Sequence, residues 1–239
     1  MKKIGSLITW VLAAAMCIAV AGCTPAKPKG IVEKDGTVNY YDDEGNVIYE
    51  NMKGWYDLGG KYVFVDRNEG KQVKGSTVNL IDIDEDGFAV MDSYSEEKLP
   101  VLVKAREVVD GLREEGMSQD DLLMKCYKFV EDMPYLLKDY PITEHMSEFK
   151  CYDAHYANNL LNAYDDQLKL GGDCTSDAAC LAYLFDAAGL TDIYYCHTES
   201  HAWVRADGRY WDPLYIETKG MEWYDMAEYP EEAQFEVEI

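Results

Sequence analysis

Hydrophobic and polar residues follow two different rhythms along the chain, and the change between them comes near residue 95. Over residues 36–95, short alternating segments are separated by acidic, glycine-containing turns, as at 42–46 and 84–87. Such alternation between turns is typical of β-hairpins. Further along, apolar residues recur at three- and four-residue steps, which indicates amphipathic helices. The sequence therefore predicts a small all-β region over 36–95 and a second domain over 96–239.

Three helices are expected in the first half of the second domain. One is predicted over 99–115, with its apolar residues on a single face. The next begins after Ser118, whose side chain can cap it, and ends at Pro134, since proline cannot continue a helix. A third candidate spans about 153–164. All three present an apolar stripe that needs a common core.

A fourth, more apolar helix is predicted from Thr175 to Gly189, followed by strands. Two alternating segments, 202–205 and 209–211, flank the turn 206–208 and indicate a hairpin. The acidic tail over 222–239 adds a last strand or remains loose. This order predicts an α+β fold in which the fourth helix packs on an antiparallel sheet.

The candidate chemistry lies at the start of that helix. Cys174 follows Gly171 and Gly172, which predict a flexible turn, and it begins the helix, where the macrodipole favours a thiolate. His201 and Asp212 lie downstream in the predicted hairpin. A cysteine nucleophile needs an imidazole to take its proton and a carboxylate to orient the imidazole. The three residues therefore form a candidate catalytic triad, which requires no metal and no organic cofactor.

Four linked motifs extend this pattern, namely G-D-C-T at 172–175, A-A-G-L at 187–190, H-A-W-V at 201–204 and W-D-P at 211–213. Together they resemble the transglutaminase-like superfamily of papain-type cysteine enzymes, over about residues 120–215. The resemblance implies a papain/transglutaminase-like core. It also implies that Cys174 is the nucleophile, His201 the general base and acid, and Asp212 the orienting carboxylate. Met133-Pro134-Tyr135 lies where many members carry a tyrosine-containing segment, and no role follows from it.

The implied activity is acyl transfer at an amide, with a protein or peptide at the cell surface as substrate. Water as acceptor would make the protein a peptidase or amidase, and an amine would make it a transamidase. The superfamily also contains inactive copies. The alternative is therefore a wall-binding or scaffolding protein that keeps the fold without the chemistry.

The all-β region has a resemblance of its own. It repeats at roughly twenty residues, and G-W-Y-D-L-G-G-K-Y-V-F-V-D at 54–66 resembles the hairpin repeats of bacterial cell-wall-binding and glucan-binding modules. This implies a cell-wall polymer as partner, with Trp55, Tyr56, Tyr62 and Phe64 as candidate ligand-stacking aromatics. The alternative is that these side chains fill the core of a small β-domain.

The N-terminus is expected to direct export. Lys2 and Lys3 precede a mostly apolar stretch that ends in Val20-Ala21-Gly22-Cys23. These four residues resemble a bacterial lipobox, which implies a signal peptide over 1–22, a lipid on Cys23 and a tether over 23–35. A membrane-spanning helix is the alternative, although the apolar stretch is short for one. The expected location is the outer face of the bacterial membrane, where acyl chains on Cys23 enter the bilayer.

The net charge and the cysteines limit the classes of function that the sequence allows. The net charge of −23 excludes nucleic-acid binding, which needs a basic face, and it suits either solubility outside the cell or cationic partners. Of seven cysteines, Cys17 leaves with the signal. Besides Cys23 and Cys174, four cysteines remain, namely Cys126, Cys151, Cys180 and Cys196. They are either buried thiols or form up to two disulfides.

Three aspartates at 82–86 resemble the start of a calcium-binding loop. Ser93 stands at the position of the bidentate glutamate of such a loop, so a simple turn is predicted.

Overall fold

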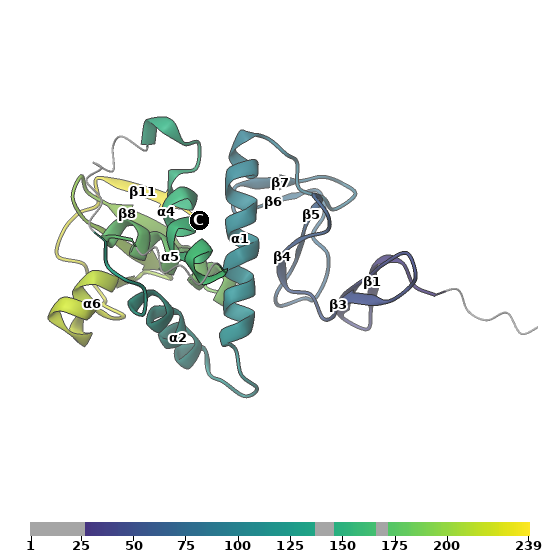
Figure 1. Cartoon of the computed structure of the whole chain (residues 1–239), viewed down its shortest axis with the longest axis horizontal. Coiled ribbons are helices and arrows are strands. Elements are labelled where there is room, and N and C mark those ends of the chain that lie inside the picture. The colour runs from purple at the N-terminus through teal and green to yellow at the C-terminus, as the bar shows by residue number, and fades with distance from the viewer. Residues whose placement is uncertain (1–26, 137–145, 166–171) are drawn as a thin grey trace, which may run out of the picture.

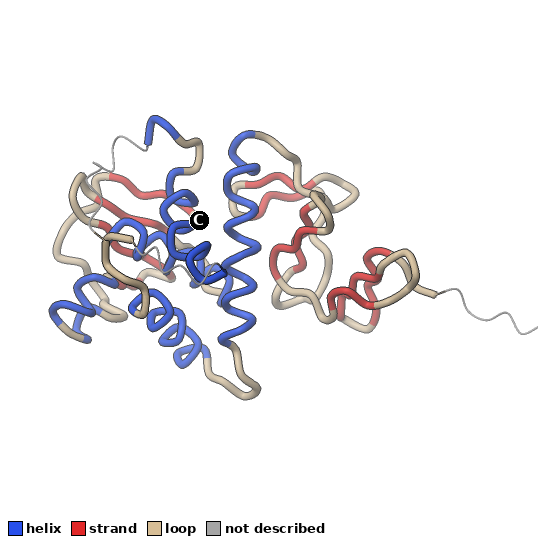
Figure 2. Tube along the Cα trace, viewed as in Figure 1, coloured by secondary structure: helices blue, strands red, loops and turns tan. Residues whose placement is uncertain are grey.

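The computed structural model describes residues 27–136, 146–165 and 172–239. The predicted signal peptide and Cys23 lie outside the described residues. The N-terminal strands lie on one side of the long helix α1, and the other helices and a four-stranded sheet lie on its opposite side (Figure 1). Coloured by secondary structure, the two sides separate into an all-β part and a mixed part (Figure 2). The protein is therefore a mixed helix-and-sheet fold with small antiparallel sheets, as predicted at that level.

The all-β part consists of seven short strands. They form one three-stranded sheet and two hairpins, all antiparallel, from β1 (Gly30–Lys34), β2 (Thr37–Tyr41), β3 (Val47–Tyr49), β4 (Gly54–Asp57), β5 (Tyr62–Val65), β6 (Ser76–Val78) and β7 (Ile81–Ile83). Strand β1 lies inside the stretch predicted as a tether, so that prediction is wrong for Gly30–Lys34. Asp35 and Gly36, both with positive φ, form the two-residue turn that returns β1 onto β2.

The described helices include α1 (Ser93–Leu112), α2 (Gln119–Glu131), α4 (Tyr152–Asp165), α5 (Cys174–Ala188) and α6 (Pro213–Lys219), with a short 3-10 turn η1 (Met221–Trp223). Four of these helices agree with the predicted order, whereas α6 is not among those that the sequence predicts. Helix α1 starts six residues before the predicted Leu99, because the Asp92 side chain caps it by accepting from the backbone N–H groups of Tyr94 and Ser95. Ser118 caps α2 as expected. Among the helices in the described ranges, none is long and apolar enough to cross a membrane.

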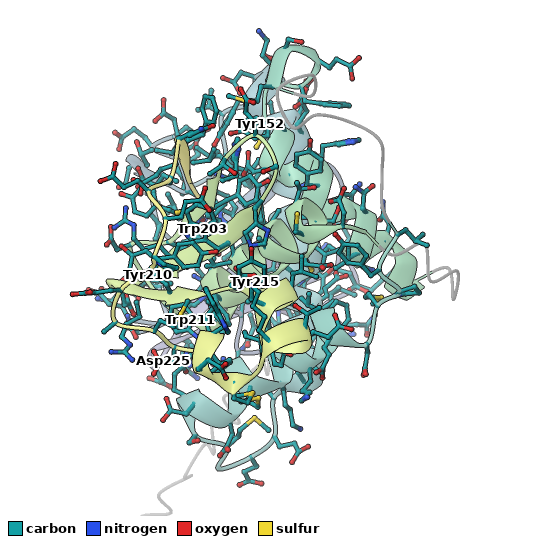
Figure 3. All side chains as sticks on the ribbon, turned by 90° about the vertical axis from the view of Figure 1, so that its left-hand side faces the viewer. Tyr152, Trp203, Tyr210, Trp211, Tyr215 and Asp225 are labelled. Carbon is teal, nitrogen blue, oxygen red and sulfur yellow. The ribbon has the colours of Figure 1, made fainter. Side chains whose placement is uncertain are left out.

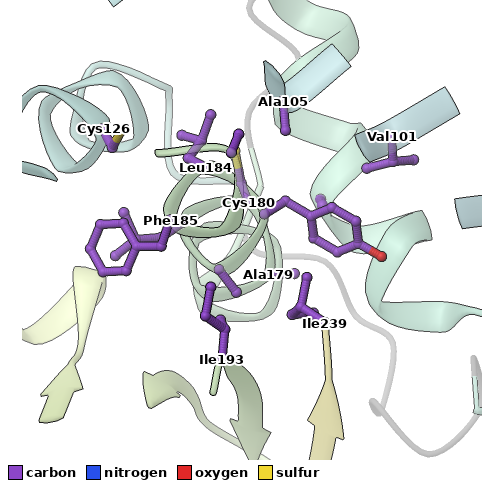
Figure 4. Close-up of a cluster of buried hydrophobic side chains, with 14 of the residues drawn as sticks. Val101, Ala105, Cys126, Ala179, Cys180, Leu184, Phe185, Ile193 and Ile239 are labelled. Carbon is purple, nitrogen blue, oxygen red and sulfur yellow. The ribbon is translucent and has the colours of Figure 1, made fainter. Parts of the chain in front are cut away.

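Helix α5 is the centre of the mixed part. All 15 of its residues are buried. Val101 and Ala105 of α1, Cys126 of α2, and Ile193 and Ile239 next to the sheet surround it (Figure 4). A helix that is apolar on every side has to be covered on every side. The position of α5 therefore follows from its composition, and its first residue is Cys174.

The sheet beside α5 is antiparallel, in the order β10-β9-β8-β11, and consists of β8 (Tyr194–His197), β9 (Ala202–Ala206), β10 (Arg209–Trp211) and β11 (Phe235–Glu238). Asp207 and Gly208 both have positive φ and turn β9 into β10, which confirms the predicted hairpin. Strand β11 comes from the acidic tail, so the tail adds a strand. Helix α5 packs on β8 and β9, as expected.

The predicted boundary at residue 95 does not separate two cores. Trp55, Phe64, Ile81 and Ile83 of the all-β part are buried in the same cluster as α1, α5 and the sheet. A smaller cluster, which includes Val38, Met52 and Val63, joins the three-stranded sheet to β4 and β5. Two further contacts cross the junction, because Arg106 Nε donates to the Trp55 carbonyl and Arg67 pairs with Asp186 of α5 at 3.2 Å. The second half of the all-β part is therefore integral to the main core.

Candidate active site

Cys174 is held at the first turn of α5 by the residues that precede it. Asp173 caps the helix, because its Oδ1 accepts from the backbone N–H groups of Thr175 at 3.1 Å and Ser176 at 3.4 Å. Gly172 is buried, and its backbone exchanges hydrogen bonds with Pro134 and Leu136 at 3.2 and 2.6 Å. The thiol thus begins a helix whose start is fixed on both sides.

Gly172 serves close packing rather than flexibility. A Cβ at this position would lie 2.3 Å from Ser176 Cβ and 2.7 Å from Leu160 Cδ1. Its φ is not in the left-handed region, so no unusual backbone conformation is required there. The prediction of a flexible glycine turn is therefore wrong at Gly172, and Gly171 lies outside the described residues.

His201 and Asp212 are in direct contact. His201 precedes β9 and Asp212 follows β10, so the hairpin turn between these strands brings the two side chains together. His201 Nε2 donates to Asp212 Oδ2 at 2.7 Å, and the acceptor-only carboxylate fixes this tautomer. In this tautomer Nδ1 of His201 carries no proton and is the hydrogen-bond acceptor of the ring. Asp212 is fully buried and His201 is 8% exposed.

Asp212 is itself held by two residues that the sequence did not reveal. Its Oδ1 caps α6 by accepting from the Tyr215 backbone N–H at 2.9 Å, and its Oδ2 accepts from the Tyr229 hydroxyl at 2.6 Å. The Tyr215 ring stacks on His201 at 4.4 Å, and the Tyr229 ring stacks on Trp203 at 4.2 Å. Trp203 and Tyr215 lie on the face that carries the sheet and α6 (Figure 3). The three-residue spacing of an N-cap could have identified Tyr215, whereas no local signal marks Tyr229.

The Cys174 thiol lies against the residues on either side of His201. Its Sγ is 4.0 Å from the carbonyl oxygen of Ser200, and the backbone N–H of Ala202 lies near enough to act on the pKa of the thiol. Thr198 Oγ1 accepts from the backbone N–H groups of Ser200 and His201, which fixes this loop. The structure therefore brings the thiol, the imidazole and the carboxylate of the predicted triad into one small region.

The surroundings of Cys174 disfavour ionisation of its thiol to a thiolate in the resting protein. Burial, followed by the Asp173 carboxylate, raises the pKa of the Cys174 thiol to about 12, although the Ala202 N–H acts in the opposite direction. Burial, together with Asp173, Glu217 and Asp212, also holds the pKa of Asp177, one turn into α5, well above its usual range. The expected stabilisation of a thiolate by the helix macrodipole is outweighed. In the described part of the chain, no three His, Cys, Asp or Glu side chains are placed to hold a metal ion.

The other cysteines are buried thiols. Cys126, Cys151, Cys180 and Cys196 are all free and buried, as is Cys174. Burial raises the pKa of Cys126 to about 12, and it has the same effect on Cys151 and Cys196. The sequence left open whether these four cysteines are buried thiols or form disulfides, and the structure shows buried thiols. Cys174 differs from the other four in its place at the first turn of α5 and in its exposure of 8%, against 0–1% for the others.

Three of the four candidate ligand-stacking aromatics are buried in the protein. Trp55, Tyr56 and Phe64 are 1%, 6% and 6% exposed, and only Tyr62 is partly exposed. The Trp55 indole donates to Asn79, the Arg106 guanidinium covers the Tyr56 ring at 4.0 Å, and another arginine lies over Phe64. The interpretation as ligand-stacking aromatics is wrong for these three, because other side chains of the protein cover them. They fill the core, as the alternative held.

Comparisons with known proteins add little to this description. No protein-family model matches the chain, and no curated protein matches it. Choline-binding protein F from Streptococcus pneumoniae, solved with a peptidoglycan analogue, is similar over 27% of this chain and 20% of its own, with 19% identity and a TM-score of 0.21. The choline binding domain of Spr1274 from the same organism is similar over 27% of this chain and 72% of its own, with 20% identity and a TM-score of 0.21. Both are choline-binding proteins.

Proposed function

We propose that the protein is a transglutaminase-like cysteine enzyme that transfers the acyl group of a peptide or amide through a thioester on Cys174. The observation that carries the proposal is the 2.7 Å contact between His201 Nε2 and the buried carboxylate of Asp212, beside a thiol at a helix N-terminus. An imidazole oriented through Nε2 keeps Nδ1 available for a proton. A buried structural cysteine has no need of either group.

The reaction would proceed in two steps. His201 Nδ1 takes the thiol proton, and the Cys174 sulfur attacks the amide carbon, whose C–O π pair moves onto the oxygen. When the tetrahedral intermediate collapses, the C–N bond breaks and the amine leaves with the proton held by His201. Water or a second amine then attacks the thioester, with His201 again accepting and returning the proton. The first choice of acceptor makes the enzyme a peptidase or amidase, and the second makes it a transamidase.

The raised pKa of the thiol sets a condition on this mechanism. With the pKa of Cys174 near 12, the resting site holds a neutral thiol at pH 7. The proton therefore leaves as the substrate binds, when the imidazolium of His201, stabilised by Asp212, can pair with the thiolate. The protein is in this respect unlike enzymes that keep a preformed thiolate.

The same burial favours a second candidate function, a scaffolding protein that retains the fold without catalysis. Cys174 is 8% exposed, and Asp173, Asp177 and Asp212 all act against its thiolate. In that case the His201–Asp212 pair would serve only to hold the β9–β10 hairpin onto α6. Under either candidate function, the protein could bind a cell-wall polymer, but it would do so through surfaces other than the buried hairpin aromatics.

The experiment that separates the two candidates is acylation of the purified exported part by p-nitrophenyl acetate, followed by intact-protein mass spectrometry. The enzyme is expected to gain one acetyl group on Cys174. Cys174→Ala and His201→Ala should abolish the reaction without unfolding the protein, and Asp212→Asn should leave residual activity. Cys196→Ala, which removes another buried thiol outside the triad, is the matched control and should react like wild type. An unacylated wild-type protein, or full activity of Cys174→Ala, would contradict the proposal.

The proposed location is the outer face of the bacterial membrane, with the protein held by a lipid on Cys23. The lipobox-like stretch Val20-Ala21-Gly22-Cys23 supports this proposal. A cell-surface protein or peptide is then the substrate class. A proteomic comparison of the surface of cells that carry wild type or Cys174→Ala would identify it.

A further inference from the structure

The carboxylate of Asp212 is fully buried and accepts three hydrogen bonds from side chain and backbone donors. Its Oδ1 accepts from the Tyr215 backbone N–H at 2.9 Å. Its Oδ2 accepts two bonds, from His201 Nε2 at 2.7 Å and from the Tyr229 hydroxyl at 2.6 Å. The imidazole and the phenol therefore share one carboxylate oxygen, and the bond that either of them makes affects the bond of the other.

Tyr229 belongs to the segment 224–234, which joins η1 to β11 and is fixed near both ends. Met226 exchanges two backbone hydrogen bonds with Tyr210 of β10, at 2.8 and 2.9 Å. At the other end, the Gln234 N–H donates to the carbonyl oxygen of His197 in β8 at 3.0 Å. The segment therefore crosses from the β10 edge of the sheet to β8, and backbone hydrogen bonds set its path.

The ring of Tyr229 is held in place independently of its hydroxyl. It stacks on the Trp203 ring, with the ring centroids 4.2 Å apart and the planes inclined by 12°. Trp203, in β9, is itself only 1% exposed. The change Tyr229→Phe keeps this stack and removes the O–H group alone. The effect of the hydroxyl on Asp212 can thus be separated from the packing of the ring.

The hydrogen bond from Tyr229 to Asp212 depends on the protonation state of His201. Beside a neutral imidazole, the carboxylate carries its full negative charge, and hydrogen bonds to a full charge are the strong ones. Beside an imidazolium, part of that charge is compensated, so the same O–H group stabilises the carboxylate less. The hydroxyl therefore favours the state in which His201 Nδ1 carries no proton. This is the state that can accept the proton of the Cys174 thiol.

We propose that Tyr229 is a positioning residue that keeps the His201–Asp212 pair ready to act as a base, an inference that rests on the proposed function. By donating to Oδ2, its hydroxyl holds the carboxylate in place against His201 Nε2 and weakens the affinity of the pair for a second proton. Tyr229 itself transfers no proton. The proton that leaves Cys174 goes to His201 Nδ1 and from there to the leaving amine.

The Tyr229 hydroxyl remains a donor over the whole working range of pH. Burial, followed by the hydrogen bond to Asp212, holds its pKa well above the usual range of a tyrosine. The other ionisable groups near the pair and Tyr229 come from the start of α5, from α6 and from the tail, namely Asp173, Cys174, Asp177, Tyr215, Glu217, Lys219 and Glu231. Tyr229→Phe leaves all of them in place, so a change in pH dependence can be assigned to the lost O–H group.

The test is the pH dependence of Cys174 acylation by p-nitrophenyl acetate, measured on the exported part of the chain across about pH 5–9. Because the thiol is protonated in the resting protein, the acid limb of this profile reports the His201–Asp212 pair. In Tyr229→Phe the acid limb should move to higher pH by about 1 unit, as expected when a hydrogen bond to a charged group is lost. The rate on the acid limb should therefore fall by up to about tenfold, and the rate above the limb should change much less.

Tyr210→Phe is the matched control. It removes a hydroxyl from the neighbouring tyrosine, whose ring centroid lies 6.0 Å from that of Tyr229, and it leaves the backbone bonds to Met226 in place. The profile of this variant should coincide with that of wild type.

Each other outcome overturns the inference in a distinguishable way. An unchanged acid limb in Tyr229→Phe, whether or not the rate falls at every pH, means that the hydroxyl only supports the packing around Asp212. A limb that moves to lower pH means that the hydroxyl acts in the opposite direction. An equal shift in Tyr210→Phe assigns the effect to the packing of the tail. A wild-type protein that is never acylated on Cys174 contradicts the proposed function, and the inference is withdrawn with it.

Discussion

Replacing Gly172 by alanine tests whether packing at the start of α5 positions Cys174. The new Cβ would lie 2.3 Å from Ser176 Cβ and 2.7 Å from Leu160 Cδ1, whereas carbon atoms in contact prefer about 3.5–4.0 Å. Ser176 Cβ is attached directly to the backbone of α5 and cannot rotate away. The first turn of α5, or the strand-like segment that holds Gly172, therefore has to move by about 1 Å.

The expected cost follows from this displacement. Overpacking a well-packed core costs about 1–3 kcal/mol of the free energy of unfolding. In a domain of this size, 1 kcal/mol corresponds to about 2–4 °C in Tm, so Gly172→Ala should melt about 2–12 °C below wild type. Since a 1 Å misplacement of a catalytic group can reduce a rate by about 10²-fold, acylation of Cys174 should fall by a similar factor.

The assay is thermal unfolding followed by circular dichroism, with the acylation rate measured on the same preparations. Gly111→Ala is the matched control, because a Cβ there meets no atom within 4 Å and the residue lies near the end of helix α1. That variant should be as stable as wild type or more stable, by up to about 1 kcal/mol, since alanine favours the helix. If Gly172→Ala melts at the wild-type temperature and reacts at the wild-type rate, close packing at Gly172 does not position the thiol.

Two further changes test the electrostatics and the anchor. Asp173→Asn keeps a side chain that caps α5 equally well but removes the largest charge that raises the pKa of Cys174, so the pH profile of iodoacetamide alkylation should move to lower pH. Asp192→Asn, an exposed change away from the site, should leave the profile in place, and a shift to higher pH in Asp173→Asn would contradict the argument. Cys23→Ser should abolish labelling of cells by a palmitate analogue and release the protein from the membrane, whereas Cys17→Ser should remain labelled. A Cys23→Ser protein that is still labelled and membrane-bound would show that the lipobox interpretation is wrong.

Local features were predictable because the residues that encode them are neighbours in the chain. The Asp207-Gly208 turn, with both residues in the left-handed region, specifies the β9–β10 hairpin. Helix α5 begins after its cap Asp173 and ends at Gly189, whose φ is 102°. Once the hairpin and this helix are known, the order of Cys174, His201 and Asp212 makes their proximity a reasonable prediction. Their catalytic roles stay a prediction.

Contacts between distant segments were decided only by the tertiary structure. The alternating pattern of β4 and β5 shows that one face of Trp55 and Phe64 is buried, but it does not say whether a ligand or helix α1 covers that face. The hydrogen bond from Tyr229 to Asp212 joins residues 17 positions apart, and no sequence motif connects them. The sequence around Gly172 predicts a flexible turn. Only the tertiary structure shows that Leu160 and Ser176 pack against this residue. The sequence alone determined where chain elements start and turn, because backbone preference is local. Which surface each element covers is decided only when the whole chain folds. The pKa of Cys174 depends on the resulting burial and on the charges that folding brings near the thiol.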